Sequence, residues 1–207
     1  MLETTALACE RGGQRLFSGL GFALASGGLL RVRGANGSGK TSLLRILAGL
    51  TRPAAGSVRW RGGEIAGGYG GEMLFLGHAA AVKDELTVLE NLEFSARLSG
   101  LNSSKDEFNE ALERLGIGRL ANLPARYLSQ GQRKRAALAR LALSGAGPLA
   151  FPLWLLDEPL ASLDDQAIGR VSTLCAAHLA SGGMLALTSH QDAAIPAASV
   201  QTIELGG

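Results

Sequence analysis

The sequence predicts an α/β fold: a parallel sheet with helices, an antiparallel β lobe and an inserted helical segment. Three patterns carry this prediction. Weakly alternating apolar runs separated by glycine turns, typical of antiparallel strands, cover residues 2–8, 16–24 and 57–60. Short apolar runs alternate with helix patterns early in the chain and again near its end, as in a parallel sheet. Between them, from Thr87 to Leu143, apolar residues recur at helical spacing.

The elements of the predicted parallel sheet follow one another along the chain. Leu29–Arg33 is a short strand that leads into a glycine loop and a helix over Lys40–Leu50. A further apolar run, Met73–Leu76, is followed by one glycine and then by His78. The last part of the chain carries two apolar runs with a helix pattern between them: Leu153–Leu156, Gln166–Leu179 and Met184–Leu187. This alternation favours strands that lie parallel in one sheet.

Length and composition indicate one globular domain that needs partners for any membrane role. The 207 residues suit a single domain, residues 1–207, with its helical part over roughly 84–145. A net charge of +2 gives no reason to expect a nucleic-acid partner. The longest uncharged stretches, Leu16–Leu30 and Leu141–Leu156, are too short to span a bilayer and contain glycines or prolines. The two cysteines are expected to be reduced thiols in a cytosolic compartment.

The glycine loop GANGSGKT, Gly34–Thr41, matches the phosphate-loop pattern at every fixed position and lies between a strand and a helix. Its glycines allow successive backbone N–H groups to turn toward phosphate oxygens. Lys40 would bring positive charge to the β- and γ-phosphates of ATP, and the Thr41 hydroxyl would bind Mg²⁺. The alternative, a chance match in a glycine-rich chain, is disfavoured by the strand–helix context. The expected nucleotide-binding residues are Gly34, Ala35, Asn36, Gly37, Ser38, Gly39, Lys40, Thr41 and Ser42.

The stretch LWLLDEP, Leu153–Pro159, is typical of a buried strand that ends in two acids. Asp157 lies at the carboxyl end of this strand, where α/β folds bind ligands, and would hold Mg²⁺. Glu158 would polarise the attacking water as a general base. An Asp-Glu pair at this place is also typical of a helix cap. The phosphate loop upstream favours the catalytic interpretation.

The stretch YLSQGQRKRAALAR, Tyr127–Arg140, combines a helix cap at Ser129 with Gly131, which permits close approach of a ligand to the helix N-terminus. In isolation it would be a capped, solvated helix with basic side chains. Its Leu-Ser-x-Gly-Gln, 25 residues before Asp157, resembles the signature motif of ABC-type ATPases. PLASLD resembles their D-loop, and TSHQ places His190 at their switch histidine.

This resemblance, carried by four motifs in the family's order, implies an ABC nucleotide-binding domain that hydrolyses ATP. In that family two such domains, here as a homodimer, hold two ATP molecules head to tail. Asp157, Glu158 and His190 of one copy, with its phosphate loop, would face the other copy's signature residues, which are Ser129, Gly131 and Gln132. ATP would close the dimer and hydrolysis would open it.

Two positions depart from the family's pattern. The family has a glutamine nine residues before the threonine of a stretch similar to LTVLENL, and the same count back from Thr87 ends on His78. His78 would contact Mg²⁺ or water, because a neutral imidazole nitrogen accepts hydrogen bonds as an amide oxygen does. The alternative is a packed histidine without a nucleotide role. Where the family stacks an aromatic ring on adenine, Arg11 stands here, with Phe17 further on; a guanidinium can stack on a purine, and a solvated loop residue is the alternative.

Several stretches, CERGGQRLFSGLGF, FLGH and PLWLLDEP, together with the short chain, resemble the ATP-binding subunits of cytochrome c maturation transporters. This resemblance implies a peripheral protein on the cytoplasmic face of the bacterial inner membrane, bound to membrane-spanning subunits and serving haem export or handling. The alternatives are a subunit for another small cargo and a soluble, non-transport ABC ATPase. Soluble types carry two domains in one chain or a long coiled-coil insertion, and neither pattern occurs here.

Overall fold

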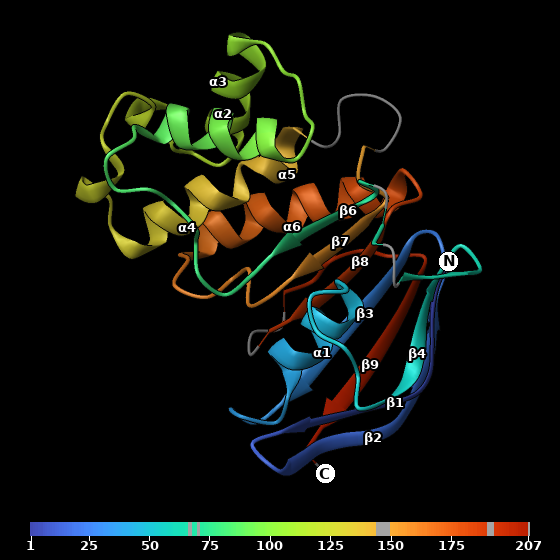
Figure 1. The fold of residues 1–207 in the computed structure, drawn as a ribbon. Coiled ribbons are helices and arrows are strands. Elements are labelled where there is room, and N and C mark those ends of the chain that lie inside the picture. The colour runs from blue at the N-terminus through green and yellow to red at the C-terminus, as the bar shows by residue number, and fades with distance from the viewer. Residues whose placement is uncertain (66–67, 70, 144–149, 190–192, 207) are drawn as a thin grey trace.

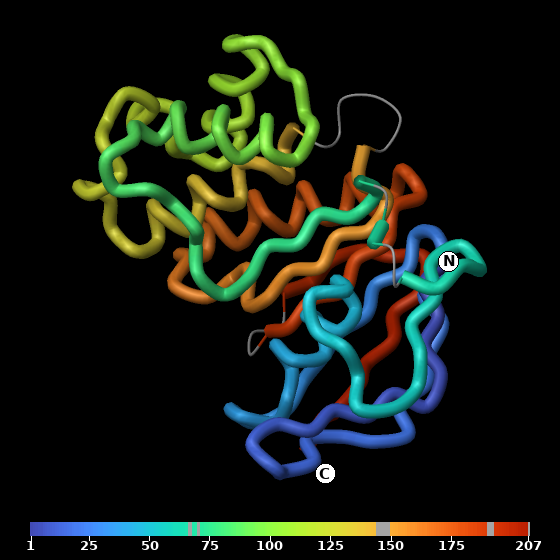
Figure 2. Tube along the Cα trace, viewed as in Figure 1, coloured from blue at the N-terminus to red at the C-terminus, as the bar shows by residue number. Residues whose placement is uncertain are grey.

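The computed structural model describes residues 1–65, 68–69, 71–143, 150–189 and 193–206. Within them the chain forms an antiparallel sheet, a parallel sheet and a helical subdomain (Figure 1). Figure 2 shows the chain leaving β6 to build the helical subdomain, drawn in green and yellow, and returning to the sheet at β7, drawn in orange. The predicted α/β fold is confirmed.

The antiparallel sheet is built by the first part of the chain in the order β2-β1-β4-β5. β1 and β2 form a hairpin in which Arg11 lies opposite Gln14, and Gly12 and Gly13 supply the turn with positive φ angles. The predicted antiparallel strands are confirmed, and each extends further than its apolar run. The bounds are β1 (Leu2–Arg11), β2 (Gln14–Leu24), β4 (Ala55–Trp60) and β5 (Gly63–Glu64).

The second sheet is parallel throughout, in the order β6-β7-β8-β3-β9. Its strands are β3 (Gly28–Gly34), β6 (Met73–Leu76), β7 (Leu153–Leu156), β8 (Met184–Thr188) and β9 (Ser199–Leu205). The order puts the carboxyl ends of β3, β8 and β7 side by side, which brings the phosphate loop and the acids to one edge. Four of the five strands were predicted. The edge strand β9 was missed, because its alternating polar residues leave no apolar run.

Each face of the parallel sheet has its own hydrophobic core. On β7, Leu153 and Leu155 pack in the core that contains α1 (Lys40–Leu47) and residues of the antiparallel sheet. Trp154 and Leu156 point to the other face, into the core shared with α6 (Asp165–Ala180) and the helical subdomain. This two-residue alternation explains why a strand buried on both faces appears as a continuous apolar run in the sequence. The predicted helix over Lys40–Leu50 is shorter in the structure and ends at Leu47.

The helical subdomain begins at a capping box in which Thr87 and Glu90 bond each other's backbone N–H groups. Ser104 with Glu107 and Ser129 with Gln132 repeat this cap at the next two α-helices. The extent of the subdomain as a unit stays a prediction. Its elements are α2 (Val88–Leu98), α3 (Lys105–Arg114), η2 (Gly118–Leu120), η3 (Ala125–Tyr127), α4 (Gln130–Leu138) and α5 (Arg140–Leu143).

Candidate nucleotide site

The phosphate loop connects β3 to α1, and its glycines are required by its backbone. Gly34, Gly37 and Gly39 have φ angles of 141°, 85° and 103°, a region that other residues enter only with strain. A Cβ at Gly34 would also lie 2.3 Å from the Leu205 carbonyl oxygen of β9, whereas Gly37 has open space around it. The loop can therefore turn its backbone N–H groups toward a ligand. Asn36 is exposed, and Ser38 and Ser42 are half-buried.

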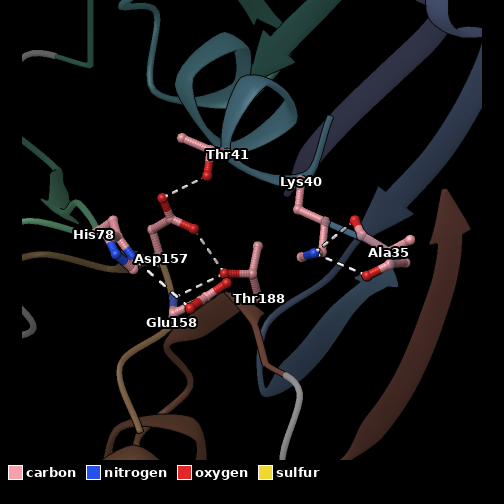
Figure 3. Close-up of polar contacts among 8 residues, drawn as sticks. Ala35, Lys40, Thr41, His78, Asp157, Glu158 and Thr188 are labelled. Carbon is pink, nitrogen blue, oxygen red and sulfur yellow. Dashed lines mark hydrogen bonds and ion pairs between the residues drawn. The ribbon is translucent and has the colours of Figure 1, made fainter. Parts of the chain in front are cut away.

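Lys40 is the buried cation of this loop, with 6% of its surface exposed. Its ammonium donates hydrogen bonds to the carbonyl oxygens of Gly34 and Ala35, at 2.8 and 3.0 Å (Figure 3). These bonds close the loop around the ammonium and keep the positive charge next to the loop's N–H groups.

Asp157 joins the loop helix to two neighbouring strands. Thr41 Oγ1 donates to Asp157 Oδ2 at 2.9 Å, and Thr188 Oγ1 donates to Asp157 Oδ1 at 2.7 Å. Thr188 Oγ1 in turn accepts from the Glu158 backbone N–H at 2.8 Å (Figure 3). Asp157 and Thr188 are 1% and 0% exposed, so this carboxylate and the Thr188 hydroxyl are fixed in the interior, whereas Thr41 is an exposed residue. Thr188 was not predicted from the sequence; its signal is a polar residue at the end of an apolar strand.

The same network fixes the position of Glu158. This residue has a φ of 48°, a left-handed conformation that is unfavourable for a non-glycine side chain and frequent at functional sites. His78 lies beside it, with Nδ1 3.6 Å from Glu158 Oε2, and 70% of the histidine side chain is exposed. This exposure is inconsistent with a packed core histidine. A role of His78 at the nucleotide, as catalytic group or Mg²⁺ ligand, stays a prediction.

The residues at this edge fit a Mg²⁺ ion. The Thr41 hydroxyl and the Asp157 carboxylate are hard oxygen donors that already lie 2.9 Å apart. The described residues contain no group of three or more His, Cys, Asp or Glu that could enclose a metal ion by themselves. Few protein ligands are typical of Mg²⁺, which keeps several waters and is bound together with substrate phosphates.

The signature residues lie on α4, in the helical subdomain and apart from α1 (Figure 1). Ser129 Oγ accepts from the Gln132 N–H at 3.3 Å, and Gln132 Oε1 accepts from the Ser129 N–H at 2.9 Å. A Cβ at Gly131 would lie 2.7 Å from the Ser162 carbonyl oxygen, so this glycine admits the segment after Glu158. Gly131 is predicted to permit the close approach of a ligand, and its contact with Ser162 is a second reason for a glycine at this position. In a single chain these three residues are separate from the phosphate loop.

The residues predicted near adenine and on the signature helix lie in different surroundings. Arg11 is exposed at the end of β1, at the hairpin turn. Phe17 lies closer to the loop, because a Cβ at Gly39 would be 3.3 Å from its ring. The capped, solvated helix that this segment would form in isolation does not describe Lys134, which is buried. His190 lies outside the described residues.

Comparison with known proteins agrees with this geometry. Residues 17–161 match the ABC transporter family. The chain is 48% identical to the cytochrome c biogenesis ATP-binding export protein CcmA of Nitrosospira multiformis, over 99% of this chain and 98% of that protein. It is 45% identical to the protein of the same name from Dechloromonas aromatica, over the full length of both.

Solved structures show the same fold at low sequence identity. A putative ABC transporter ATP-binding protein from Pyrococcus furiosus has a TM-score of 0.81 at 23% identity, with 97% of this chain and 96% of that chain covered. A dimeric ATP-binding cassette in a post-hydrolysis state, bound to ADP and Pi, has a TM-score of 0.77 at 21% identity, with 92% and 88% covered. Fold, motif geometry and full-length similarity agree, and the chain belongs to the ABC transporter family, among its cytochrome c biogenesis ATP-binding export proteins.

Proposed function

We propose that this chain is the ATP-hydrolysing subunit of an ABC transporter complex that exports or handles haem in c-type cytochrome biogenesis. The observation that carries the ATPase part is the hydrogen-bonded chain from Thr41 through Asp157 and Thr188 to Glu158. It connects the phosphate loop to the proposed base within one chain. The names of the full-length relatives support the role in cytochrome c biogenesis. Haem as cargo rests on the sequence resemblance described above.

Each group of the preassembled site has a defined task in this proposal. Lys40 and the loop N–H groups bind the phosphates, and Thr41 and Asp157 would hold the Mg²⁺. A bound Mg²⁺ supplies positive charge to the oxygens of the transferring phosphoryl group. Glu158 orients the attacking water and accepts its proton, and His78 beside it is a further polar group. His190 would have the switch-histidine role that the sequence resemblance implies. Water exclusion and the last γ-phosphate contacts come from a second copy.

The second copy would contribute the N-terminus of α4. Its Ser129, Gly131 and Gln132 are exposed or half-buried, and the positive end of the helix is available to an anion. The long 3.3 Å bond to Ser129 Oγ leaves that hydroxyl able to donate to a phosphate oxygen. A head-to-tail homodimer would therefore complete two sites at once.

Membrane-spanning subunits would dock beside the segment that follows β6. A cavity of about 380 Å³ lies between residues 75–82 and helices α2 and α4. Phe94 and Leu98 of α2 border it and are 43% and 74% exposed. Such exposed apolar side chains favour burial against a partner. No helix in the described part of the chain is long and apolar enough to cross a membrane. We propose a peripheral place on the cytoplasmic face, as the sequence resemblance implies.

Reconstitution tests the proposal at both levels. The chain is coexpressed with its membrane subunits in a bacterium that lacks its own copy, and two readouts are taken: ATP hydrolysis of the purified complex and covalent haem in periplasmic c-type cytochromes. We expect both activities to require the chain. If the purified complex hydrolyses ATP but cells that lack the chain still assemble c-type cytochromes normally, the cargo is another small molecule. A chain that hydrolyses ATP but never copurifies with membrane proteins would indicate a soluble ABC ATPase.

A further inference from the structure

Lys134 is a buried lysine for which the phosphate-loop chemistry gives no role. It lies on α4, two residues after Gln132, and is 9% exposed. Its neighbours Arg133 and Arg135 are both more exposed than Lys134. Its ammonium forms no hydrogen bond and no ion pair with any residue in the described ranges. The side chain is largely buried although Nζ is not fully enclosed, so retaining its charge calls for a compensating interaction.

The surroundings of Lys134 identify that interaction. The side chain lines the 380 Å³ cavity together with Asp157 and Pro159. It also lines a second cavity, of about 230 Å³, together with His78 and Ser162. Burial lowers the pKa of Lys134, and attraction by Asp157 and then by Glu158 opposes that effect. The lysine and Asp157 therefore border one cavity, the lysine from α4 and the acid from the end of β7.

We propose that Lys134 is a positioning residue, which holds the Asp157–Glu158 pair by charge attraction and so connects the signature helix to the acids of its own chain. The proposal rests on the ATPase function proposed above. Lys134 and Asp157 border the same cavity and both are largely buried, so their charges attract more strongly than exposed charges at the same separation would. Arg133, the residue before Lys134, provides a second contact between α4 and the segment that follows His78. Arg133 forms an ion pair with Asp84, beyond the far end of the segment after His78.

One consequence separates a positioning role from plain structural support. Lys134 and a Mg²⁺ held by Asp157 would carry like charges close to the same carboxylates. Removing the lysine charge should therefore strengthen Mg²⁺ binding, while it loosens the position of Glu158 and slows hydrolysis. A residue that only stabilises the fold would not change these two quantities in opposite directions.

The test compares Lys134→Met, which keeps most of the side-chain volume, with Lys134→Arg, which keeps the charge and has cavity space on two sides. Lys105→Met is the matched control, because Lys105 is exposed at the first turn of α3. For Lys134→Met we expect kcat to fall about tenfold, a part of the roughly 10²–10⁴-fold effect of a general base. The KM for ATP should stay within about twofold, because the phosphate loop is unchanged.

A second readout needs no turnover. Binding of a fluorescent ATP analogue is titrated with Mg²⁺, and Lys134→Met should reach half-saturation at a severalfold lower Mg²⁺ concentration. Lys134→Arg and Lys105→Met should resemble the parent in both readouts. Parent-like kcat and Mg²⁺ dependence in Lys134→Met would overturn the proposal, and so would equal losses in the Met and Arg variants. A parent chain that binds no nucleotide would instead refute the ATPase function itself.

Discussion

The two halves of the proposed site differ in how complete they are within one chain. At the sheet edge, buried Asp157 accepts hydrogen bonds of 2.9 and 2.7 Å from Thr41 and Thr188, so the part that would hold metal and phosphate is already assembled. On the signature helix, the side chains of Ser129 and Gln132 accept hydrogen bonds from each other's backbone N–H groups, and neither residue is buried. The sheet edge therefore has its ligand-binding groups in place within one chain, whereas the signature helix leaves its groups available to a second copy of the chain.

The difference follows from what supports each half. The acids and Thr188 are at the ends of β7 and β8, adjacent parallel strands with a hydrophobic core on each face. The signature helix belongs to a subdomain inserted between β6 and β7. Its α4 packs Ala136 and Leu138 into the core that the subdomain shares with the sheet, and its N-terminal end meets the segment after Glu158 at Gly131 and Ser162. The signature residues at that end are exposed or half-buried, whereas Asp157 and Thr188 are buried at the sheet edge.

The largest effect is expected from a substitution in the phosphate loop, which belongs to the half of the site that one chain already assembles. Lys40→Ala should abolish tight ATP binding, because Lys40 is the cation that the loop encloses. Equilibrium binding of a fluorescent ATP analogue measures it. Arg45→Ala, an exposed basic residue on the same helix, is the control and should bind normally. ATP affinity near that of the parent in Lys40→Ala would show that this loop does not bind phosphate.

The next largest effect is expected at Glu158, in the same half of the site, where a substitution should slow ATP hydrolysis without preventing ATP binding. Glu158→Gln should keep ATP binding but slow hydrolysis roughly 10²–10⁴-fold, the usual contribution of a general base. Without turnover, ATP should hold two copies together. Nucleotide affinity, turnover rate and the molar mass in the presence of ATP are measured on one preparation. A normal rate would exclude Glu158 as the base.

The third prediction concerns the signature helix, the half of the site that needs a second copy. Ser129→Arg should leave ATP binding to a single chain nearly intact, because Ser129 caps α4, and α4 lies apart from α1 (Figure 1). It should block ATP-driven dimerisation, since a bulky cation would displace the helix N-terminus from the partner's γ-phosphate.

Ser129→Ala is the matched control, because it removes the cap hydroxyl without adding bulk, at a cost of about 1 kcal/mol in stability. Light scattering with ATP in the Glu158→Gln background reports the dimer for both variants. Normal dimers of Ser129→Arg would contradict the shared site.

A smaller effect is expected where the two halves meet, at His78. His78→Gln supplies the family's usual acceptor and should retain most ATPase activity, whereas His78→Ala should lower activity and weaken its coupling to the membrane subunits. Activity and melting temperature are measured with those subunits present. If both substitutions lower the melting temperature and leave the activity per folded molecule unchanged, His78 is structural.

The sequence was sufficient for the features that depend on local pattern. The loop Gly34–Thr41, the acid-ended strand β7 and the capped helix α4 each carry their signal in a few consecutive residues. Spatial partners carry no such signal. Thr188 is 31 residues from Asp157, and it joins the site because β8 lies beside β7 in the sheet.

The surroundings of Lys134 and His78 could be judged only from the packing of the folded chain. Lys134 has basic neighbours on both sides, so composition favours a solvated helix, and only the arrangement around the acids explains its burial. His78 follows an apolar strand, so a packed histidine was the alternative to a role at the nucleotide; 70% of its side chain is exposed, which excludes the packed position. In both cases the deciding information was the position of a distant segment.

The smallest effect concerns what holds β7 in place behind the acids. Trp154 of β7 stacks on His178 of α6, with ring centroids 3.8 Å apart and planes 7° apart, and His178 Nε2 lies 3.2 Å from the Met184 carbonyl oxygen. Burial lowers the pKa of His178 from 6.5 to about 4. Between these values the unfolded chain binds the proton and the folded chain does not, so the free energy of unfolding falls as the pH falls.

This stabilisation is complete above pH 6.5 and is lost as the pH falls toward 4, by about 2–3 kcal/mol. His178→Phe keeps a flat ring against Trp154 but cannot be protonated. We expect the melting temperature of the parent to drop between pH 7 and pH 4.5 by several degrees more than that of His178→Phe, at roughly 2–4 °C per kcal/mol for a chain of this size. ATP hydrolysis at pH 7 should be similar in both, because His178 is neutral there. Equal pH dependence of melting in the two proteins would show that His178 takes up its proton without cost in the folded state, and that the support behind the acids does not depend on a neutral ring.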